Sequence, residues 1–231
     1  MVMSEGEHNE IVAQLAALVG KQQRSDSPMA SGLGELVASA AQHVPGAQFA
    51  GMTVASRTQG ISTAAATSTY ARILDEIQQR HQEGPCLSAA WEHHTVRIDD
   101  VETERRWPRY RIDALAETPV RSVLAIEVFV SDDSLGALNF YSEHPRTFEQ
   151  ESTELGVIFA AHIALAWNMF RRNAQFRSAL ASRDLIGQAK GIIMNEFNID
   201  AVRAFELLTR LSQESNTKLV DIAQQIIDNI D

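Results

Sequence analysis

The chain has 231 residues and a formal net charge of -10, because 30 Asp and Glu residues outnumber 20 Lys and Arg. This length suits one large or two modest domains, and a hydrophobic share of 45% is ordinary for a globular protein. The single cysteine, Cys86, excludes an internal disulfide and agrees with a reducing cytoplasm. The apolar runs are too short to span a bilayer, and the acidic N-terminus is not a secretory signal. We therefore expect a cytoplasmic protein with no membrane partner.

The first 30 residues are expected to lead into the first domain. Apolar residues recur at helical spacing over residues 10–18, which predicts a short helix. Residues 20–34 are polar and contain Pro28, as is typical of a linker. A further helix is predicted over residues 33–44.

Residues 47–141 alternate between strand and helix patterns. Period-2 alternation from Ala47 predicts a strand, and a short connection at residues 56–60 joins it to a second strand at 61–67 in a hairpin. The remaining expected elements are a helix at 70–80, a turn at 84–87, a strand at 95–98, a helix at 107–116, and a hairpin of strands 122–130 and 135–141. This order predicts an α+β fold, in which helices pack around an antiparallel sheet.

A long helix is expected to follow the sheet, from about residue 148 to residue 197, with Thr147 as its N-cap. Part of this helix fits a heptad frame, which predicts a homodimer joined by a coiled coil. The predicted seam consists of Leu155, Phe159, His162, Ala166, Met169, Asn173, Phe176 and Leu180. In this interpretation His162 and Asn173 are polar interruptions that fix the register. The alternative is that the first part of the helix only covers the sheet.

Two short helices are expected after the long one, and the three together would bury one small all-α core. Asp200 is a suitable N-cap for a helix at residues 201–213. That helix is predicted to pack through Phe205, Leu208 and Leu211. A third helix is expected at residues 218–230, capped by Asn216 and Thr217, with Leu219, Ile222, Ala223, Ile226 and Ile227 facing inward.

Two glycines, Gly187 and Gly191, lie four residues apart inside the long helix. Each costs about 1 kcal/mol of helix stability relative to alanine, so the pair requires a reason. Arg183, Gly187 and Lys190 share one helical face, which would leave room for a nucleic-acid loop between two cations. The alternative is that the glycines let two helices pack closely and that the cations are solvated.

Both parts of the chain resemble known domain families. Residues 31–167 resemble a GAF domain, a small-molecule sensor, in EGPCL at 83–87, RIDDV at 97–101, RWP at 106–108, VRSVL at 120–124 and LGALNFYS at 135–142. Residues 168–231 resemble an ANTAR domain in LIGQAKGIIM at 185–194, AFELL at 204–208, SQ at 212–213 and NTKLVDIA at 216–223. Residues 1–30 would be the leading helix and linker of a GAF–ANTAR regulator of the actinobacterial type.

The ANTAR resemblance implies an RNA-binding transcription antiterminator. Such domains bind stem-loops in nascent transcripts near terminators, commonly as dimers, and would affect RNA polymerase only indirectly. The implied RNA-binding residues are Arg183, Gly187, Gln188, Ala189, Lys190, Gly191, Ser212, Gln213, Asn216, Thr217 and Lys218. Residues 174–231 hold six Lys or Arg and eight Asp or Glu, so any RNA contact must be local.

Other polar groups give no catalytic constellation and no metal site. Cys86 has no His or Asp partner implied by spacing, and it is interpreted as an inert thiol. His93 and His94 are adjacent but lack further metal ligands, while Asp99 and Asp100 are interpreted as caps in preference to phosphoacceptors. We therefore expect no enzyme. The sequence does not identify the GAF ligand, and the GAF pocket is a candidate site for a small molecule. The alternative function is a module that docks a protein partner through its C-terminal helices without binding RNA.

Overall fold

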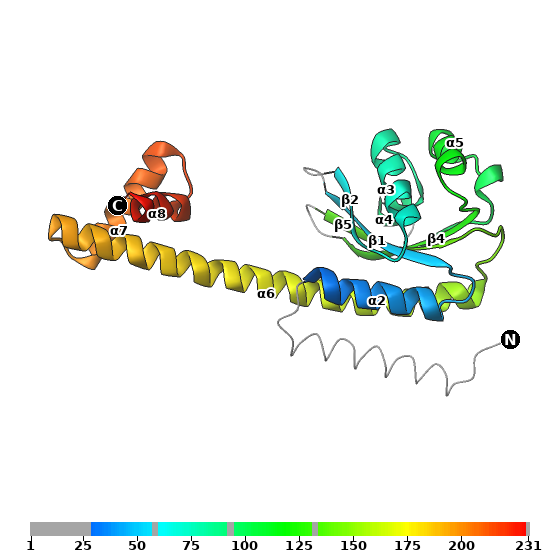
Figure 1. Cartoon of the computed structure of the whole chain (residues 1–231), viewed down its shortest axis with the longest axis horizontal. Coiled ribbons are helices and arrows are strands. Elements are labelled where there is room, and N and C mark those ends of the chain that lie inside the picture. The colour runs from blue at the N-terminus through cyan, green and yellow to red at the C-terminus, as the bar shows by residue number, and fades with distance from the viewer. Residues whose placement is uncertain (1–28, 57–59, 92–94, 131–133, 230–231) are drawn as a thin grey trace, which may run out of the picture. The chain divides into compact units, whose positions relative to one another are not determined.

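A computed structural model describes residues 29–56, 60–91, 95–130 and 134–229 (Figure 1). The chain divides into two compact units, Met1–Asn168 and Met169–Asp231, and each is described by itself. The helix expected at residues 10–18 lies outside the described residues. Helix α2 spans Met29–His43, so the end of the predicted linker is helical instead. The helix extends because Leu33, Leu36, Val37 and Ala40 form a buried stripe that anchors it on the sheet.

The first unit is built on a five-stranded antiparallel sheet with the order β2-β1-β5-β4-β3. Its strands are β1 (Phe49–Ser56), β2 (Gly60–Ala66), β3 (Thr95–Ile98), β4 (Ser122–Val130) and β5 (Ser134–Ser142). The β1–β2 and β4–β5 hairpins confirm the two predicted hairpins. Pairing of β5 with both β1 and β4 makes β5 the central strand of the sheet.

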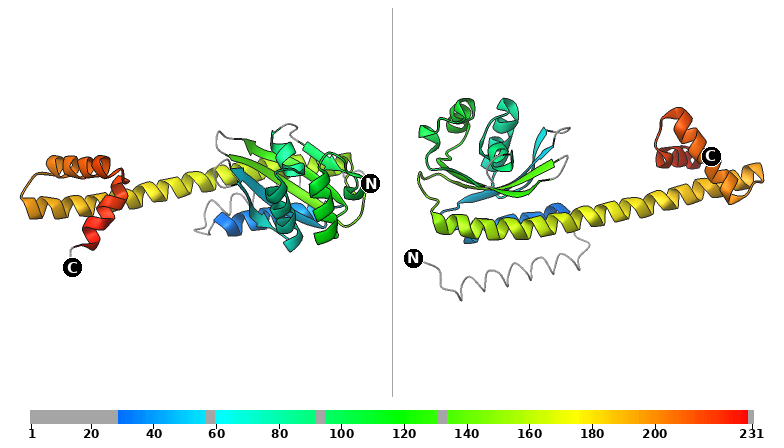
Figure 2. Two further views of the ribbon diagram at one scale, coloured as in Figure 1. Left: turned by 90° about the horizontal axis from the view of Figure 1, so that it is seen from above. Right: turned by 180° about the vertical axis from the view of Figure 1, so that it is seen from behind.

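Helices cover both faces of this sheet (Figure 1, Figure 2). On one face lie α3 (Thr69–His81), α4 (Pro85–Trp91) and α5 (Pro108–Glu117), with a short 3-10 helix at Val101–Thr103. On the other face, α2 and the first part of α6 (Gln150–Phe197) lie side by side. Residues 84–87 were predicted as a turn, but only Gly84 turns. Its backbone φ is 147°, and its carbonyl accepts from the amide of Ser88 to open α4.

The beginning of α6 differs from the sequence prediction. Thr147 is not its N-cap, because its hydroxyl donates to the carbonyl of His144 at 2.8 Å and closes the preceding loop. The helix starts at Gln150, and the Ser152 hydroxyl accepts from the amide of Glu149 at 3.1 Å. The same hydroxyl donates to the carbonyl of Pro45 at 2.9 Å, which ties α6 to the end of α2.

The second unit contains the end of α6, α7 (Ala201–Ser215) and α8 (Leu219–Asp228). Its core consists of Ala189, Ile193, Ala204, Leu208, Ile222 and Ala223. Leu219, Ile226 and Ile227 are partly buried against this core, in agreement with the predicted inward face of the third helix. Phe205 and Leu211 were predicted in the core, but each remains 46% exposed.

The ends of α7 are fixed by two polar residues. The Asp200 carboxylate accepts from the amides of Val202 and Arg203 at 3.0 and 2.9 Å, which confirms it as the N-cap. Asn216 does not cap α8 as predicted. It has a left-handed backbone with φ of 49° and is the C-cap of α7, a conformation that asparagine tolerates better than most residues. Lys218 takes the N-cap position of α8 without a side-chain hydrogen bond.

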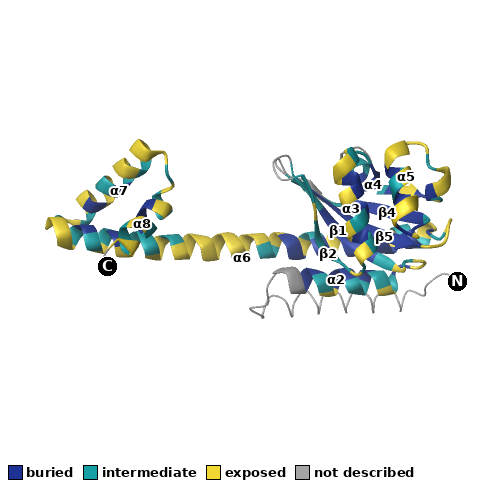
Figure 3. Cartoon of the chain, turned by 45° about the horizontal axis from the view of Figure 1, so that its top comes forward, coloured by how far each residue is buried: buried dark blue, intermediate teal, exposed yellow. Residues whose placement is uncertain are grey.

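Helix α6 is one uninterrupted element that contributes to both units (Figure 3). Residues 171–181, between the two cores, are all exposed.

Among the described helices, α6 is the one long and apolar enough to cross a membrane, with mean hydropathy 1.3 over 18 residues. In that window 39% of the residues are buried within the protein, where the apolar side of the helix covers the sheet.

Candidate functional site

Both exposed glycines of α6 face open space. Apart from the backbone of the helix itself, a Cβ placed on Gly187 or Gly191 would meet no heavy atom of the described residues within 4 Å. Close packing of another described helix therefore does not explain the two glycines. The alternative that they let two helices pack closely fails within the described part of this chain. Arg183 is exposed and Lys190 is half-buried on the same side, so the helix presents a bare backbone strip between two cations. We call Arg183, Gly187, Lys190 and Gly191 the glycine face.

The opposite side of the same helix turns holds the small three-helix core. Ala189 and Ile193 are buried there against α7 and α8. Ala189 is 0% exposed, so it cannot contact RNA as predicted, and its role is to anchor the glycine face. Gln188 is exposed beside it.

The turn between α7 and α8 brings the remaining predicted RNA-binding residues together. The Ser212 hydroxyl donates to the carbonyl of Thr217 at 2.6 Å, so these two residues hold the turn. Gln213, Asn216 and Lys218 are exposed. Lys218 stands at the start of α8, where first-turn amides favour an anion, although Asp221 in that turn opposes one. The turn and the glycine face are joined through the shared core.

The structure divides the predicted dimer seam into two halves. Leu155, Phe159 and Ala166 are at most 2% exposed within the first unit, so they are not available to a second copy. This half covers the sheet, in agreement with the alternative that the first part of the long helix only covers the sheet. Phe176 and Leu180 are instead 65% and 44% exposed.

Met169 and His162 are half-buried, and Asn173 is exposed. The His162 ring nitrogen Nδ1 pairs with the carbonyl of Ile158 at 2.8 Å within α6. The apolar heptad ends at Leu180. Adding seven residues to Phe176 and Leu180 gives Arg183 and Gly187, so the glycine face follows the predicted seam on the same side of α6.

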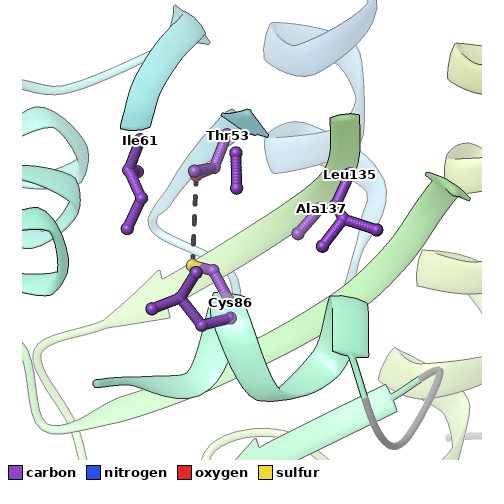
Figure 4. A pocket seen from close by; sticks show the side chains of 7 residues that line it. Thr53, Ile61, Cys86, Leu135 and Ala137 are labelled. Carbon is purple, nitrogen blue, oxygen red and sulfur yellow. Dashed lines mark hydrogen bonds between the residues drawn. The ribbon is translucent and has the colours of Figure 1, made fainter. Parts of the chain in front are cut away.

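The first unit carries a small pocket on the face covered by α3 and α4 (Figure 4). Its lining is mostly apolar and consists of Thr53, Ala55, Ile61, Cys86, Leu87, Leu135 and Ala137. Cys86 lies in the first turn of α4. Burial, and then the nearby charge of Asp75, raise the pKa of Cys86 to about 12, so the residue stays a neutral thiol and a poor nucleophile.

A buried carboxylate next to this pocket was missed by sequence reasoning. Asp75 on α3 is 4% exposed and accepts from the hydroxyls of Thr53 and Thr63 at 2.7 and 2.6 Å. Burial raises the pKa of Asp75 to about 6, against the lowering effect of these two hydrogen bonds. The available signal was its position, since Asp75 falls between Ala71 and Gln78 on the buried stripe of α3.

Asp100 is the N-cap of the 3-10 helix, which confirms its interpretation as a cap, whereas the Asp99 side chain forms an ion pair with Arg97 at 2.8 Å. Asp100 accepts from the amide of Glu102 and forms a two-bond ion pair with Arg121, with both distances at 3.0 Å. The hydrogen bonds from Arg121 lower the pKa of Asp100. His93 and His94 lie outside the described residues. In the part of the chain that the structure describes, no group of three or more His, Cys, Asp or Glu could hold a metal ion.

Comparison with family models identifies both units. A GAF domain matches residues 31–168 and an ANTAR domain matches residues 174–227. The first match covers more than half of the chain, which therefore belongs to the GAF domain family, and the two matches together show a GAF–ANTAR architecture. A search of curated proteins found no match.

Solved structures with a similar fold are distant in sequence. The GAF domain of a phosphoenolpyruvate-protein phosphotransferase from Coxiella burnetii is 16% identical, with a TM-score of 0.52 over 72% of this chain and 95% of that one. A free methionine-R-sulfoxide reductase from Neisseria meningitidis is 16% identical, with a TM-score of 0.53 over 75% and 96%. A phycoerythrobilin-bound GAF domain from a cyanobacterial phytochrome is 12% identical, with a TM-score of 0.54 over 75% and 100%. These likenesses show the GAF fold alone.

GAF domains are sensor domains, and ANTAR domains are RNA-binding antiterminator domains. The chain is therefore a regulator that joins a sensor-class unit to an RNA-binding-class unit.

Proposed function

We propose that this protein is a cytoplasmic, signal-responsive transcription antiterminator that binds RNA stem-loops in nascent transcripts. The observation that carries the proposal is the open glycine face of α6, held in place by the core of an ANTAR domain. Two helix-destabilising glycines lie where an added side chain would contact no other element of the described chain. A nucleic-acid backbone that approaches the helix between Arg183 and Lys190 would explain both the glycines and the cations.

The contact with RNA would be local. Six Lys or Arg against eight Asp or Glu in residues 174–231 leave no broad basic surface. Arg183, Lys190 and Lys218 are the cations that the fold exposes at the glycine face and at the start of α8. A site with few phosphate contacts binds modestly and shows a shallow salt dependence, because the slope follows the number of phosphates neutralised.

A homodimer would raise this modest affinity by presenting two ANTAR domains to paired stem-loops. The exposed apolar residues Phe176 and Leu180 are available to a second copy, and they lead directly to the glycine face. In a parallel dimer, Arg183 of one copy would face Arg183 of the other, and Lys190 would face Lys190. Repulsion between these like charges would oppose pairing of the two helices beyond Leu180. A signal in the GAF domain would act by changing this pairing, provided it binds the two states with different affinity.

The test is RNA binding by the double variant Lys190→Ala, Lys218→Ala at matched salt. A charge-matched control is Arg203→Ala, Arg210→Ala, which removes two exposed cations of α7. We expect the first pair to weaken binding to a paired stem-loop RNA about tenfold or more, and the control pair to change it much less. Equal binding by the folded Lys190, Lys218 variant and the wild type would refute the proposed contacts.

A second candidate function is a protein-docking module that binds no RNA. The observation that favours it is the exposure of Phe197, Val202 and Phe205 at 61%, 67% and 46%. Exposed apolar groups of this kind often mark protein interfaces. Crosslinking in cells, followed by sequencing of bound RNA and identification of bound protein, separates the two. Recovery of protein partners without RNA would support docking.

A further inference from the structure

Hydrogen bonds in the first unit converge on the buried carboxylate of Asp75. Asn139 on β5 donates from Nδ2 to the Thr53 hydroxyl at 2.8 Å. Thr53 on β1 then donates to Asp75 Oδ1 at 2.7 Å, and Thr63 on β2 donates to Oδ2 at 2.6 Å. Two strands of the sheet therefore donate directly to one side chain of α3, and a third strand orients one of these donors, an arrangement that fits the ionised form of Asp75.

Cys86 and Gln78 extend this chain toward the pocket. Gln78 donates from Nε2 to the sulfur of Cys86 at 2.9 Å, and the thiol donates to Asn139 Oδ1 at 3.0 Å. Gln78 Oε1 in turn accepts from the amide of Cys86 at 2.9 Å. Each of these groups has a defined donor or acceptor role, so a proton added at Asp75 must change the role of a neighbour.

The neighbour that can change is Thr53, because its hydroxyl has a second acceptor within reach. Its Oγ1 lies 2.7 Å from Asp75 Oδ1 and 3.9 Å from the sulfur of Cys86, the contact drawn as a dashed line in Figure 4. A protonated Asp75 would donate to Thr53 Oγ1, and the Thr53 hydrogen would turn to the sulfur. Thr53 would then accept from both Asn139 and Asp75 with its two lone pairs. Every polar atom of the cluster thus keeps a partner in both protonation states.

We propose that Asp75 is a proton-binding site of the GAF domain, and that its occupancy moves the Thr53 hydroxyl between Asp75 and Cys86. One proton from solvent binds the carboxylate, and the charge of the cluster changes from -1 to 0. Thr53 and Cys86 both line the pocket, so the two groups whose hydrogen bond would change lie at its wall. The proposal concerns the sensor unit and stands independently of RNA binding.

The surroundings leave Asp75 as the group that titrates in this cluster. Arg72 and Glu76 on α3 act on it in opposite directions, whereas Thr53 and Thr63 are neutral. Cys86 on α4, Tyr110 on α5 and Tyr141 on β5 are the titratable groups that other elements place near Asp75, and burial raises the pKa of all three well above neutrality. The pKa of about 6 for Asp75 places its change of charge in a range that cells experience.

The cluster is connected to α6 through β5. Asn139 lies between Leu138 and Phe140, whose side chains point to the opposite face of the sheet. A Cβ on Gly156 of α6 would lie 3.2 Å from the ring of Phe140. A change in the hydrogen bonds of Asn139 would therefore reach, one residue away, the place where the long helix meets the sheet.

The experiment is a titration of the full-length protein between pH 4 and pH 8, with two local reporters. The carboxyl carbon of Asp75 is followed by NMR, and the S–H stretching band of the single cysteine, Cys86, is followed by infrared spectroscopy. We expect both signals to change together with a midpoint near 6, and the amide of Gly156 to shift with them. A carboxyl that titrates near 4, as in an unfolded chain, or an S–H band that ignores pH would overturn the proposal.

Variants separate the proton site from general effects of pH. Thr53→Val removes the donor to the carboxylate, so the Asp75 midpoint should rise by about one to two pH units and the S–H band should lose its pH response. Thr53→Ser keeps the hydroxyl and should restore both, and it remains informative if the valine variant does not fold. The control Asp99→Asn, at an exposed carboxylate, should leave the midpoint unchanged. A midpoint that is unmoved in Thr53→Val would contradict the proposed role of Thr53.

Discussion

The ring of Phe140 on β5 lies against Gly156 on α6, where a Cβ would come within 3.2 Å of ring carbon Cε2 and would overlap Ile126. Gly156→Ala must therefore push α6 away from the sheet. We expect this change to lower the free energy of unfolding by about 1–3 kcal/mol, despite the better helix propensity of alanine. Urea unfolding followed by circular dichroism measures the effect. Unchanged stability would show that the helix and the sheet are not in such close contact.

Stability should depend on pH in a way that identifies Asp75. Its pKa is about 6 in the folded protein and about 3.9 in an unfolded chain, so the folded state binds the proton more tightly. The resulting stabilisation is fully present below pH 4 and is lost as the pH rises through 6, a change of about 3 kcal/mol. Other carboxylates such as Asp100 and Asp200, whose pKa values are lowered, act in the opposite direction as the pH falls.

The comparison of wild type with Asp75→Asn isolates this contribution, because the other carboxylates are common to both proteins. The difference in free energy of unfolding between the two should change by about 2 kcal/mol between pH 4 and pH 7, with the variant gaining relative to wild type as the pH rises. Urea unfolding at half-unit pH steps provides the values. A difference that is constant with pH would mean that Asp75 titrates alike in both states.

Elements with an unambiguous hydrophobic period could be predicted from the sequence. The two hairpins and β3 follow from alternation, and Asp200 follows from its place before an amphipathic run. The residues that fill the small core of the second unit could not be predicted from the size of their side chains. Phe205 and Leu211 stay partly outside because Ala189, Ala204 and Ala223 are fully buried where the three helices meet. Only the distance between helices decides between an alanine and a phenylalanine there.

The candidate sites, too, could be predicted only in part from the sequence. The glycine face could be predicted because glycine inside a helix is costly, and the described part of the chain leaves open space at both positions. The buried half of the dimer seam was misassigned because a heptad pattern does not say whether a sheet or a second helix covers it. The Asp75 cluster depends on Thr53, Thr63 and Asn139, which are far apart in sequence and meet only when β1, β2 and β5 pair.

The open half of the seam gives a prediction about oligomeric state. Phe176→Ser, Leu180→Ser replaces two exposed apolar residues, so folding should change little while self-association weakens at least tenfold. Sedimentation over a range of protein concentrations measures the dissociation constant. The matched control is Leu165→Ser, since Leu165 is 59% exposed on α6 but lies outside the seam. Equal association of the seam variant and this control would exclude α6 pairing at these residues.

The central claim, that the bare backbone of the glycine face receives RNA, is tested most directly by one variant, Gly187→Ala. An added methyl group contacts no other described element and favours the helix, so the free energy of unfolding should rise by about 1 kcal/mol. The dissociation constant for a paired stem-loop RNA, measured at fixed salt on the same preparation, should increase severalfold because the methyl group stands where the RNA approaches. A variant that is more stable and binds RNA as tightly as the wild type would contradict the claim.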